Sequence, residues 1–328
     1  MNSLQNVRAA LVHHWFVAMS GGEKVCESIS EILKAPDLYA IVADPNCLSP
    51  ILKKSSLKTS FVQRLPKANQ YYRYYAALFP VAVESFDLSE YDLVISSDSS
   101  VVKGIKTLPE TCHICYCYSP MRYAWNAFHD YTRKFGSIKK GLSSIVMSYL
   151  SMFDYVASAR VDYFVAPSET SRKRILKYYR RHADVIYPPC DIDRFKPSSK
   201  VDDYYLFVGR LVGYKMADLA VKVFNENGKR LLIVGNGPEM KALKAIASKN
   251  IEFLGWVSDE ELPEVYSNCR ALLFPGEEDF GIVPVEAMSC GTPVIAYKNG
   301  GVLETVVDNV TGMFFEEQSV SSIIKAIV

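Results

Sequence analysis

Residues 272–295 read LLFPGEEDFGIVPVEAMSCGTPVI, and this stretch decides how the second half of the 328-residue chain folds. An apolar run too short for a globular helix ends at a Pro-Gly pair, and a second apolar run closes the stretch. Between them, Pro284 suits the first turn of a helix because its missing N–H costs nothing there. Gly291 suits the helix exit, where a positive φ is needed. The stretch therefore predicts a strand, a loop, a helix over residues 284–290 and another strand.

The start of this helix predicts an anion-binding site. Its unpaired N-terminal amides, with the turn at Phe280, Gly281 and Ile282, carry partial positive charge. Glu278 precedes this turn, and Glu286 follows it in the first turn of the helix. Ionised carboxylates accept hydrogen bonds from diols, so the arrangement indicates a ligand with both phosphate and hydroxyl groups. The alternative is an acidic surface loop before a helix that an N-terminal glutamate stabilises.

The same residues carry a resemblance. The pattern E-DFGIVPV-E-AMSCGTPVIA, which starts at Glu278, resembles the E-x7-E signature of retaining GT-B glycosyltransferases of the glycogen-synthase-like family, glycosyltransferase family 4. The usual form is E-G-F-G, so Asp279 replaces a glycine and adds charge beside the expected sugar pocket. The resemblance is strongest over residues 205–315 and points to bacterial O-antigen and lipopolysaccharide mannosyltransferases. It implies an α/β fold of two Rossmann-like, doubly wound parallel-sheet domains that face a central cleft.

Composition limits the class of protein. A chain of 328 residues with 49% hydrophobic residues is natural for two domains, and its net charge of +1 gives no support to nucleic-acid binding through a global basic field. No run reaches 18 apolar residues, and the N-terminus lacks a secretion cleavage site. Eight scattered cysteines fit reduced thiols. The sequence therefore predicts a soluble, cytoplasmic protein.

Two patterns could suggest a metal site. The segment TCHICYC, residues 111–117, places residues 113, 115 and 117 on one face of a strand, and no second Cys or His pair follows at zinc-site spacing. We interpret it as a buried strand. Asp191 and Asp193 match a D-x-D metal motif, but they lie in a Pro-rich connecting pattern. We expect neither a metal ion nor a cofactor, because the nucleotide-sugar is a substrate.

Strands and helices alternate through both halves, which predicts parallel sheets with ligands at the carboxyl ends of the strands, in the cleft between domains. Residues 1–190 are the expected acceptor-binding domain, residues 191–203 the linker, and residues 204–328 the donor-binding domain. The chain stops inside an expected helix, whereas family members usually continue with further helices. The sequence thus suggests C-terminal truncation.

The first domain contributes candidate residues from two loops. Gly21 and Gly22 stand between the first expected strand and a helix, where backbone can approach a phosphate closely, or where they form only a tight turn. The segment YSPMRYAWN resembles H-S-P-M-R-Y-A-W-D in family members, with Tyr118 in place of the His and Asn126 in place of the Asp. Tyr118 can replace a hydrogen bond of that His but not its titration near neutral pH. Arg122 is a candidate for binding the acceptor or a phosphate, or for a surface ion pair.

A basic segment follows. Arg133, Lys134, Lys139 and Lys140 precede an apolar stretch, which suits docking on an anionic membrane or binding of a lipid pyrophosphate. The alternative is a solvated helix flank.

The second domain contributes cations and glycines. Gly209 and Arg210 end an expected strand, Lys215 follows in a G-R-L-x-x-x-K pattern, and two cations at a strand's carboxyl end suit a diphosphate. Gly237 leaves space near a nucleotide, and the resemblance implies a base-binding loop that includes Val257. As isolated basic residues, the two cations could equally be surface charges.

The resemblance implies a metal-independent, retaining hexosyltransferase that moves mannose from GDP-mannose to a glycan or polyprenyl-pyrophosphate-linked acceptor in cell-surface polysaccharide synthesis. Such an enzyme would contact the cytoplasmic face of the inner membrane. Arg210, Lys215 and the helix amides would stabilise the departing diphosphate, Glu286 the ribose, and Glu278 the sugar hydroxyls. UDP-sugars stay open as donors. The alternatives are a nucleotide-sugar epimerase of the same architecture and a catalytically weakened binding subunit.

Overall fold

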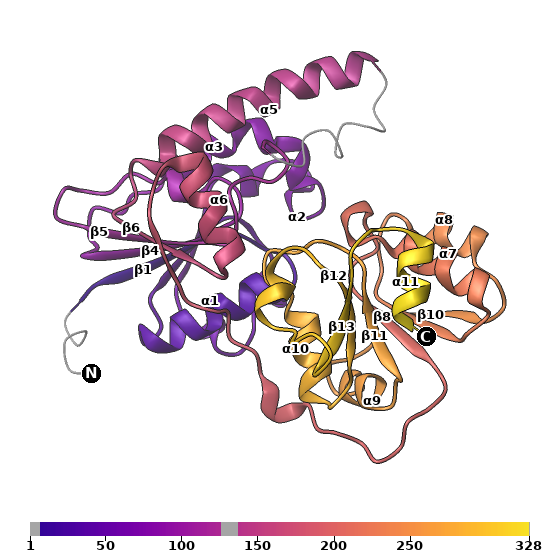
Figure 1. Cartoon of the computed structure of the whole chain (residues 1–328). Helices are drawn as coiled ribbons and strands as arrows, with labels where there is room; N and C mark the ends of the chain where they lie inside the picture. The colour runs from indigo at the N-terminus through magenta and orange to yellow at the C-terminus, as the bar shows by residue number, and fades with distance from the viewer. Residues whose placement is uncertain (1–6, 126–136, 328) are drawn as a thin grey trace. The chain divides into compact units, whose positions relative to one another are not determined.

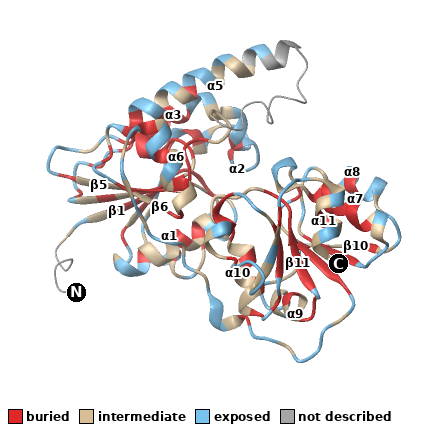
Figure 2. Cartoon of the chain, in the orientation of Figure 1, coloured by how far each residue is buried: buried red, intermediate tan, exposed pale blue. Residues whose placement is uncertain are grey.

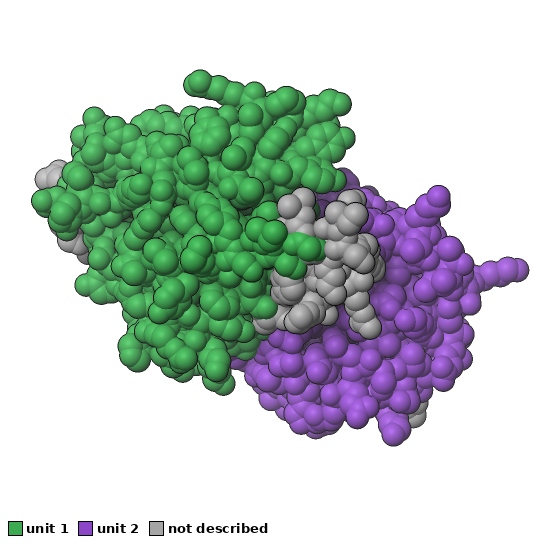
Figure 3. All heavy atoms as spheres, turned by 90° about the horizontal axis from the view of Figure 1, so that it is seen from above, with its two compact units in different colours: residues 1–189 green, residues 190–328 purple. Residues whose placement is uncertain are grey.

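The computed structural model describes residues 7–125 and 137–327. The chain divides into two compact units, residues 1–189 and residues 190–328, which are coloured separately in Figure 3. Asn126, Arg133 and Lys134 lie outside the described residues, as do the side chains of Lys139 and Lys140.

Unit 1 is built on a parallel seven-stranded sheet in the order β3-β2-β1-β4-β5-β6-β7 (Figure 1). A sheet covered on both faces needs apolar strands, and every residue of β2 except the first is buried. The strands are β1 (Ala9–Phe16), β2 (Asp37–Ala43), β3 (Leu57–Thr59), β4 (Leu93–Asp98), β5 (Cys112–Cys117), β6 (Tyr163–Ala166) and β7 (Ala183–Val185). The segment interpreted as a buried strand is therefore β5.

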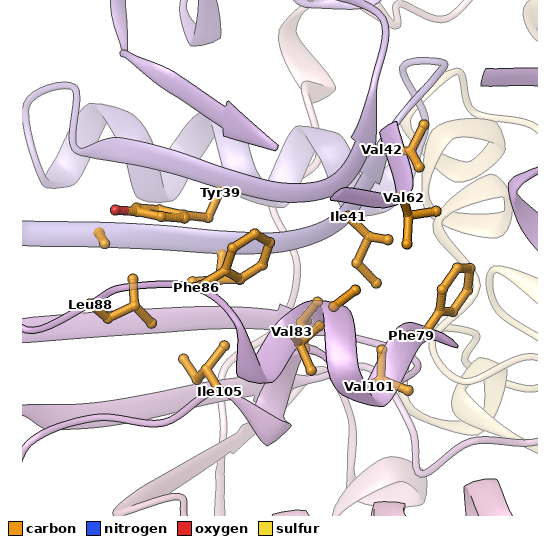
Figure 4. Packing of buried hydrophobic residues seen from close by; sticks show 14 of the residues in the cluster. Tyr39, Ile41, Val42, Val62, Phe79, Val83, Phe86, Leu88, Val101 and Ile105 are labelled. Atoms are coloured by element: carbon orange, nitrogen blue, oxygen red, sulfur yellow. The ribbon is translucent and has the colours of Figure 1, made fainter. Parts of the chain in front are cut away.

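Helices cover this sheet. They are α1 (Gly21–Ile32), α2 (Ala68–Tyr71), α3 (Phe79–Glu84), α5 (Ser137–Ser158) and α6 (Glu169–Tyr179). Short 3-10 turns join them: η1 (Pro45–Cys47), η2 (Leu52–Lys54), η3 (Phe61–Arg64), η4 (Tyr72–Leu78) and η5 (Val102–Gly104). Tyr39 and Ile41 of β2 pack with Val83 of α3 and with Phe86 in the same core (Figure 4).

Unit 2 is built on a parallel six-stranded sheet in the order β10-β9-β8-β11-β12-β13. Its strands are β8 (Tyr205–Val208), β9 (Leu231–Val234), β10 (Ile251–Gly255), β11 (Ala271–Phe274), β12 (Val294–Tyr297) and β13 (Gly312–Phe315). Its helices and 3-10 turns are η6 (Ile192–Arg194), η7 (Gly213–Lys215), α7 (Ala217–Asn227), α8 (Met240–Ile246), α9 (Leu262–Ser267), α10 (Ile282–Ser289), η8 (Gly301–Glu304) and α11 (Val320–Ile327). The central strands are almost wholly buried (Figure 2).

Both sheets have the same winding. The first strand of each unit lies in the middle, β1 between β2 and β4, and β8 between β9 and β11. The chain proceeds to one edge and then returns to the other side of that first strand. The connections that follow β1 and β4 lead to opposite sides of the sheet, as do those that follow β8 and β11. Ligands of such sheets bind at this point of reversal. The predicted α/β class of two doubly wound, Rossmann-like parallel sheets is confirmed.

Two boundaries differ from the sequence prediction. The helix expected over residues 284–290 begins at Ile282, because Gly281 occupies the N-cap. Pro284 fits the third helical position, because a residue there needs no N–H for a bond within the helix. The expected linker, residues 191–203, belongs to unit 2. It packs there because Phe195 is buried against Tyr266, with ring centroids 5.8 Å apart. Among the described residues, no helix has the length and apolar character needed to span a bilayer.

Candidate functional site

A cation and a carboxylate meet at the carboxyl edge of the unit 2 sheet. Lys215 lies in η7, directly after β8, and its Nζ forms an ion pair with Oε1 of Glu278, which follows β11. Because β8 and β11 are neighbours in the sheet, their connections meet although 63 positions separate the two residues. The side chains are 15% and 18% exposed, so the pair is shielded yet reachable from solvent.

Close backbone packing holds this pair. A Cβ atom on Gly276 would lie 2.7 Å from the Tyr214 carbonyl oxygen and 3.0 Å from the Lys215 Cα, so only glycine lets the two loops approach this closely. Met216, next to Lys215, has a left-handed φ of 57° and caps α7. Two features therefore fix the turn that carries Lys215: the close approach of the Gly276 backbone, which needs a glycine, and the left-handed φ of Met216, which non-glycine residues rarely adopt.

Residues that follow β12 hold the loop before α10 in place. Gly301 donates its N–H to the Glu278 carbonyl oxygen at 2.9 Å, and Asn299 donates to the Glu277 carboxylate at 3.1 Å. Gly281 caps α10 with a φ of 90°. The helix therefore begins at Ile282, directly after the Asp279-Phe280-Gly281 segment. The Ile282 and Val283 amides, which have no partner within the helix, lie at this helix start. The anion site that the sequence predicts at this helix start stays a prediction.

Glu286 is positioned by a residue that the sequence analysis missed. The Tyr266 hydroxyl donates to Glu286 Oε2 at 2.9 Å, and the tyrosine is fully buried. Burial and the neighbouring Glu286 raise the pKa of Tyr266 well above its usual range, so it stays a donor. The bond fixes the Glu286 carboxylate on α10. Tyr266 lies within an ordinary amphipathic pattern, so no local signal marks it.

Other predicted residues of unit 2 differ in their surroundings. Arg210 is exposed after β8, and no described residue forms an ion pair with its guanidinium. Gly209 lies against the Lys215 side chain, with a virtual Cβ 3.8 Å from its Cδ. The space at Gly237 is filled by backbone, since a Cβ there would lie 2.2 Å from the Leu211 carbonyl oxygen. Val257 packs partly into the core, whereas its neighbour Trp256 is 74% exposed.

Unit 1 holds a second pair beside its own first strand. His13 in β1 is fully buried, and its Nε2 lies 3.5 Å from Glu23 Oε1 in α1. Its Nδ1 lies 3.1 Å from the Ser97 carbonyl oxygen and 3.0 Å from the Ser97 hydroxyl. The other Glu23 oxygen accepts the Ser20 N–H at 3.1 Å and also the Ser20 hydroxyl. The pair ties β1, β4 and the start of α1 together.

The electrostatics make this a charged pair. Burial alone would lower the pKa of His13, but the Cys26 thiol and the Glu23 carboxylate raise it to about 10. Burial opposes ionisation of Glu23 as well, yet His13 lowers the pKa of Glu23 to about 2. Burial and the charge on His13 lower the pKa of His14 well below its usual value. At neutral pH, His13 is a cation, Glu23 an anion and His14 neutral.

Among the described residues, only His13, His14 and Glu23 form a group of three with metal-ligand spacing, their ligand atoms lying within 4.8 Å of one another. A metal ion requires neutral imidazole ligands. His13 is paired with the Glu23 carboxylate, its Nδ1 faces Ser97, and His14 is the third member of the group.

Tyr118 and the predicted glycines meet in unit 1. The Tyr118 hydroxyl donates to the Gly22 carbonyl oxygen at 3.0 Å and lies 2.8 Å from the Ser97 hydroxyl. Gly21 and Gly22 are the first two residues of α1, and the space around Gly21 is open. Arg122 is partly buried beyond the end of β5. Burial, reinforced by the nearby Cys26, raises the pKa of Tyr118, so it remains a neutral hydrogen-bonding residue.

The sequence analysis missed His13, Glu23 and Ser97. Two signals could have identified them: a His pair inside an apolar strand, and S-x-x-E spacing at the helix start, which is typical of a capping box.

Comparison with known proteins gives a family-model match for the second unit. Residues 191–328 match the model for "Glycosyl transferases group 1". A D-inositol 3-phosphate glycosyltransferase of Mycobacteroides abscessus is 34% identical over 154 residues, which cover 40% of this chain and 34% of that protein. A GDP-mannose-dependent alpha-(1-6)-phosphatidylinositol monomannoside mannosyltransferase of Mycolicibacterium smegmatis is 30% identical over 170 residues, 43% and 44% of the two chains. The matched part thus spans 34% and 44% of the lengths of these two relatives.

Solved structures match the whole chain in fold. The Anabaena protein HepE, crystallised with UDP and glucose, has a TM-score of 0.69 at 16% identity and covers 98% of this chain and 90% of its own. WaaG, a glycosyltransferase involved in lipopolysaccharide biosynthesis, also has a TM-score of 0.69 at 16% identity, with coverage of 97% and 89%. The second unit therefore matches the group 1 glycosyl transferase model, and the chain as a whole has the GT-B fold of these solved glycosyltransferases.

Proposed function

We propose that this chain is a retaining hexosyltransferase that uses a nucleotide-sugar and no metal ion. The observation that carries the proposal is the Lys215–Glu278 pair at the point of reversal in the unit 2 sheet, beside the free amides of α10. The match of residues 191–328 to the group 1 glycosyl transferase model supports it. Cations in this position offset the charge that develops on a departing diphosphate, which is the work a metal ion performs elsewhere.

We propose that a bound donor replaces Glu278 as the partner of Lys215. Its phosphates bind Lys215 and the exposed Arg210, and Glu278 is then released toward the sugar hydroxyls. Glu286, held by Tyr266, accepts the ribose diol. Asp279, Phe280, Gly281 and Ile282 line the sugar and phosphate side, and Gly209 and Val257 line the nucleotide side.

Unit 1 is proposed to bind the acceptor. The backbone of Gly21 and Gly22 contacts a substrate phosphate. Tyr118 holds the Gly22 backbone in place, and Arg122 binds the acceptor. Retention follows if the bond from the anomeric carbon to the phosphate oxygen breaks as the acceptor oxygen attacks from the same face. The departing diphosphate takes the acceptor proton, so no protein nucleophile is needed.

For the donor we propose GDP-mannose, because the Mycolicibacterium smegmatis relative is GDP-mannose-dependent by name. The acceptor is proposed to be a glycan or polyprenyl-pyrophosphate-linked sugar of cell-surface polysaccharide synthesis, of the O-antigen type, used at the cytoplasmic face of the inner membrane. UDP-sugars are the rival donors, since the structural neighbour HepE was crystallised with UDP and glucose.

A thermal-shift screen of GDP, UDP, ADP and their sugars tests the donor, since a ligand that binds only the folded state raises the melting temperature. We expect GDP and GDP-mannose to give the largest rise in the wild-type chain and little rise in Lys215→Met. The matched control is Lys222→Met, a lysine of α7 whose pair with Asp218 is exposed on the surface. A rise that is equal for Lys215→Met and the wild type would refute the proposed diphosphate site.

A further inference from the structure

The part of unit 1 that includes η3, α2 and η4 carries positive charge with no acid to balance it. Residues 45–83 contain six of the chain's 37 basic residues and none of its 36 acidic ones. The acids that flank this run are already engaged, since Asp44 caps η1. Glu84 pairs with Arg160 and Lys106. Because the whole chain has a net charge of only +1, this run forms a local cationic surface.

Exposed aromatic rings stand among these cations. Tyr74 is 85% exposed, Tyr71 46% and Phe61 40%, and the ring centroids of Tyr71 and Tyr74 lie 6.0 Å apart. Three exposed cations accompany the rings, and none of them forms an ion pair with a residue that the structure describes. We call the three aromatic and three basic residues the η3–η4 patch: Phe61, Arg64, Lys67, Tyr71, Arg73 and Tyr74.

Buried neighbours hold the patch in its outward position. Tyr72 and Phe79 are buried, and their ring centroids lie 4.7 Å and 6.2 Å from the Trp15 ring of β1. Val62 of η3 and Phe79 of α3 both lie in the core of unit 1 (Figure 4). Since the same short segment buries these side chains, it cannot turn its exposed rings inward without bringing buried apolar surface into water.

The segment that carries the patch lies at the carboxyl edge of the unit 1 sheet, where ligands of doubly wound sheets bind. Trp15 is the last residue but one of β1, and Ala43 ends β2. The Ala43 N–H donates to the Gln63 side chain at 2.8 Å, which places η3 at this edge. Gly21 and Gly22, which we propose to contact a substrate phosphate, follow β1 at the same edge.

An acidic glycan is the occupant that this chemistry favours. The C–H face of a pyranose ring can pack on a tyrosine ring, which removes apolar surface from water. Arginine binds carboxylates bidentately, and lysine supplies a point charge. Rings interspersed with unpaired cations therefore match a chain of sugars that carry carboxylate groups, whereas a neutral glycan would use the rings alone.

Two other occupants fit less well. The segment is divided among the four-residue α2, the 3-10 helix η4 and the six-residue α3, so it forms no long amphipathic helix of the kind that lies in a bilayer interface. A nucleic acid is held by many phosphate contacts along its backbone, and the patch provides only three cations.

We propose that unit 1 binds an acidic glycan along the η3–η4 patch, so that the acceptor of the proposed transfer carries carboxylate groups. This inference rests on the proposed function, because only that function makes the bound glycan an acceptor. The binding itself needs no nucleotide-sugar. Its failure would leave the transfer proposal standing, and failure of the donor screen would leave the glycan site standing.

Isothermal titration of the full chain with three ligands tests the site. The ligands are a hexamer of galacturonic acid, a neutral hexamer of glucose, and vesicles of phosphatidylcholine with phosphatidylglycerol. We expect the wild type to bind the uronate hexamer at least about tenfold more tightly than the neutral hexamer, because only the uronate pairs with the cations. Equal affinities for the two hexamers, or binding to the vesicles alone, would overturn the proposal.

Two variants separate the charges from the rings. Lys67→Gln with Arg73→Gln should reduce the preference for the uronate hexamer to about twofold or less. Tyr74→Ala should weaken both hexamers about tenfold, because the most exposed ring is lost. The matched control is Tyr163→Ala, a 62% exposed tyrosine that begins β6 at the opposite edge of the sheet. Wild-type uronate affinity in either patch variant, or an equal loss in the control, would contradict the proposed site.

Circular dichroism and a thermal-shift measurement with GDP accompany the titrations. Because the substituted side chains are exposed, all variants should keep the wild-type spectrum. The proposed donor contacts lie in unit 2, so GDP should raise the melting temperature of the patch variants as much as that of the wild type. A GDP shift without uronate binding would refute the glycan site alone, and uronate binding without any nucleotide shift would refute the donor site alone.

Discussion

Each unit places an ion pair beside its central first strand, and the two pairs differ in their access to water. In unit 1, His13 and Glu23 have side-chain exposures of 0% and 6%. In unit 2, Lys215 and Glu278 have exposures of 15% and 18%. The sheets are wound alike, but His13 lies within β1 itself and Glu23 in α1, whereas Lys215 and Glu278 lie in the connections that follow β8 and β11.

The difference separates a structural pair from one that can exchange partners. A buried pair is costly to break because the remaining charge has no water to solvate it. A partly exposed pair gives up little when a ligand phosphate replaces its carboxylate. On this account, unit 1 uses its pair to hold the Gly22 loop, and unit 2 offers its pair to a donor.

The largest expected effect is the loss of the buried pair. Glu23→Gln leaves the His13 imidazolium unpaired and should lower the free energy of unfolding of unit 1 by about 3–5 kcal/mol. Urea unfolding followed by tryptophan fluorescence measures it in a Trp256→Phe background, where Trp15 and Trp125 report on unit 1. The control Glu278→Gln should cost less than about 1 kcal/mol in unit 2 by calorimetry. Equal costs would show that burial does not distinguish the pairs.

The pH dependence of unit 1 should carry the signature of the same pair. The pKa of His13 is raised from 6.5 to about 10, so its stabilisation is complete below pH 6.5 and is lost as the pH rises toward 10. The pKa of Glu23 is lowered from 4.5 to about 2, so its stabilisation is complete above pH 4.5 and is lost as the pH falls toward 2.

Unit 1 should therefore be most stable between these limits and lose about 3 kcal/mol between pH 6 and pH 9. Denaturation curves at a series of pH values measure this loss. It should be smaller in Cys26→Ala and in Glu23→Gln, because both groups raise the pKa of His13, and an undiminished slope in both variants would assign the alkaline loss to other groups.

The geometry behind the partly exposed Lys215–Glu278 pair is tested by Gly276→Ala. The added Cβ would lie 2.7 Å from the Tyr214 carbonyl oxygen, so the turn that carries Lys215 must move. We expect unit 2 to lose about 1–3 kcal/mol and the nucleotide-sugar affinity to fall about tenfold. Gly213→Ala is the matched control in the same turn, since its Cβ would meet only an ordinary contact at 3.7 Å. Calorimetry and isothermal titration should separate the two variants; similar affinities would remove Gly276 from the site.

The smallest expected effect comes from Tyr118→Phe, which leaves the Gly22 carbonyl without its hydroxyl partner. Unit 1 should lose about 1 kcal/mol. Tyr116→Phe is the control, because its hydroxyl donates to the Ile186 carbonyl at 2.8 Å, away from the glycines. Both variants should lose similar stability, but only Tyr118→Phe should lower kcat/KM for sugar transfer. Equal kcat/KM values would limit Tyr118 to a structural role.

Local patterns predicted the elements, whereas the pairings depended on sheet order. The apolar runs and the Pro and Gly signals of residues 272–295 correspond to β11, α10 and β12. The Lys215–Glu278 pair was not predictable as a contact, because it arises from the adjacency of β8 and β11. Tyr266 and His13 were missed because a buried partner of a functional carboxylate has the same local pattern as any core residue. Gly237 was interpreted as space for a ligand, and Leu211 backbone fills that space.

Isothermal titration of the preferred nucleoside diphosphate and its sugar conjugate into the wild type, Lys215→Met and Glu278→Gln tests the central claim most directly. If the pair exchanges with a donor phosphate, Lys215→Met weakens both ligands by roughly 30-fold, which corresponds to ~2 kcal/mol. Glu278→Gln then leaves the diphosphate unaffected or tighter and weakens only the sugar conjugate. Wild-type affinity of Lys215→Met for both ligands would contradict the account.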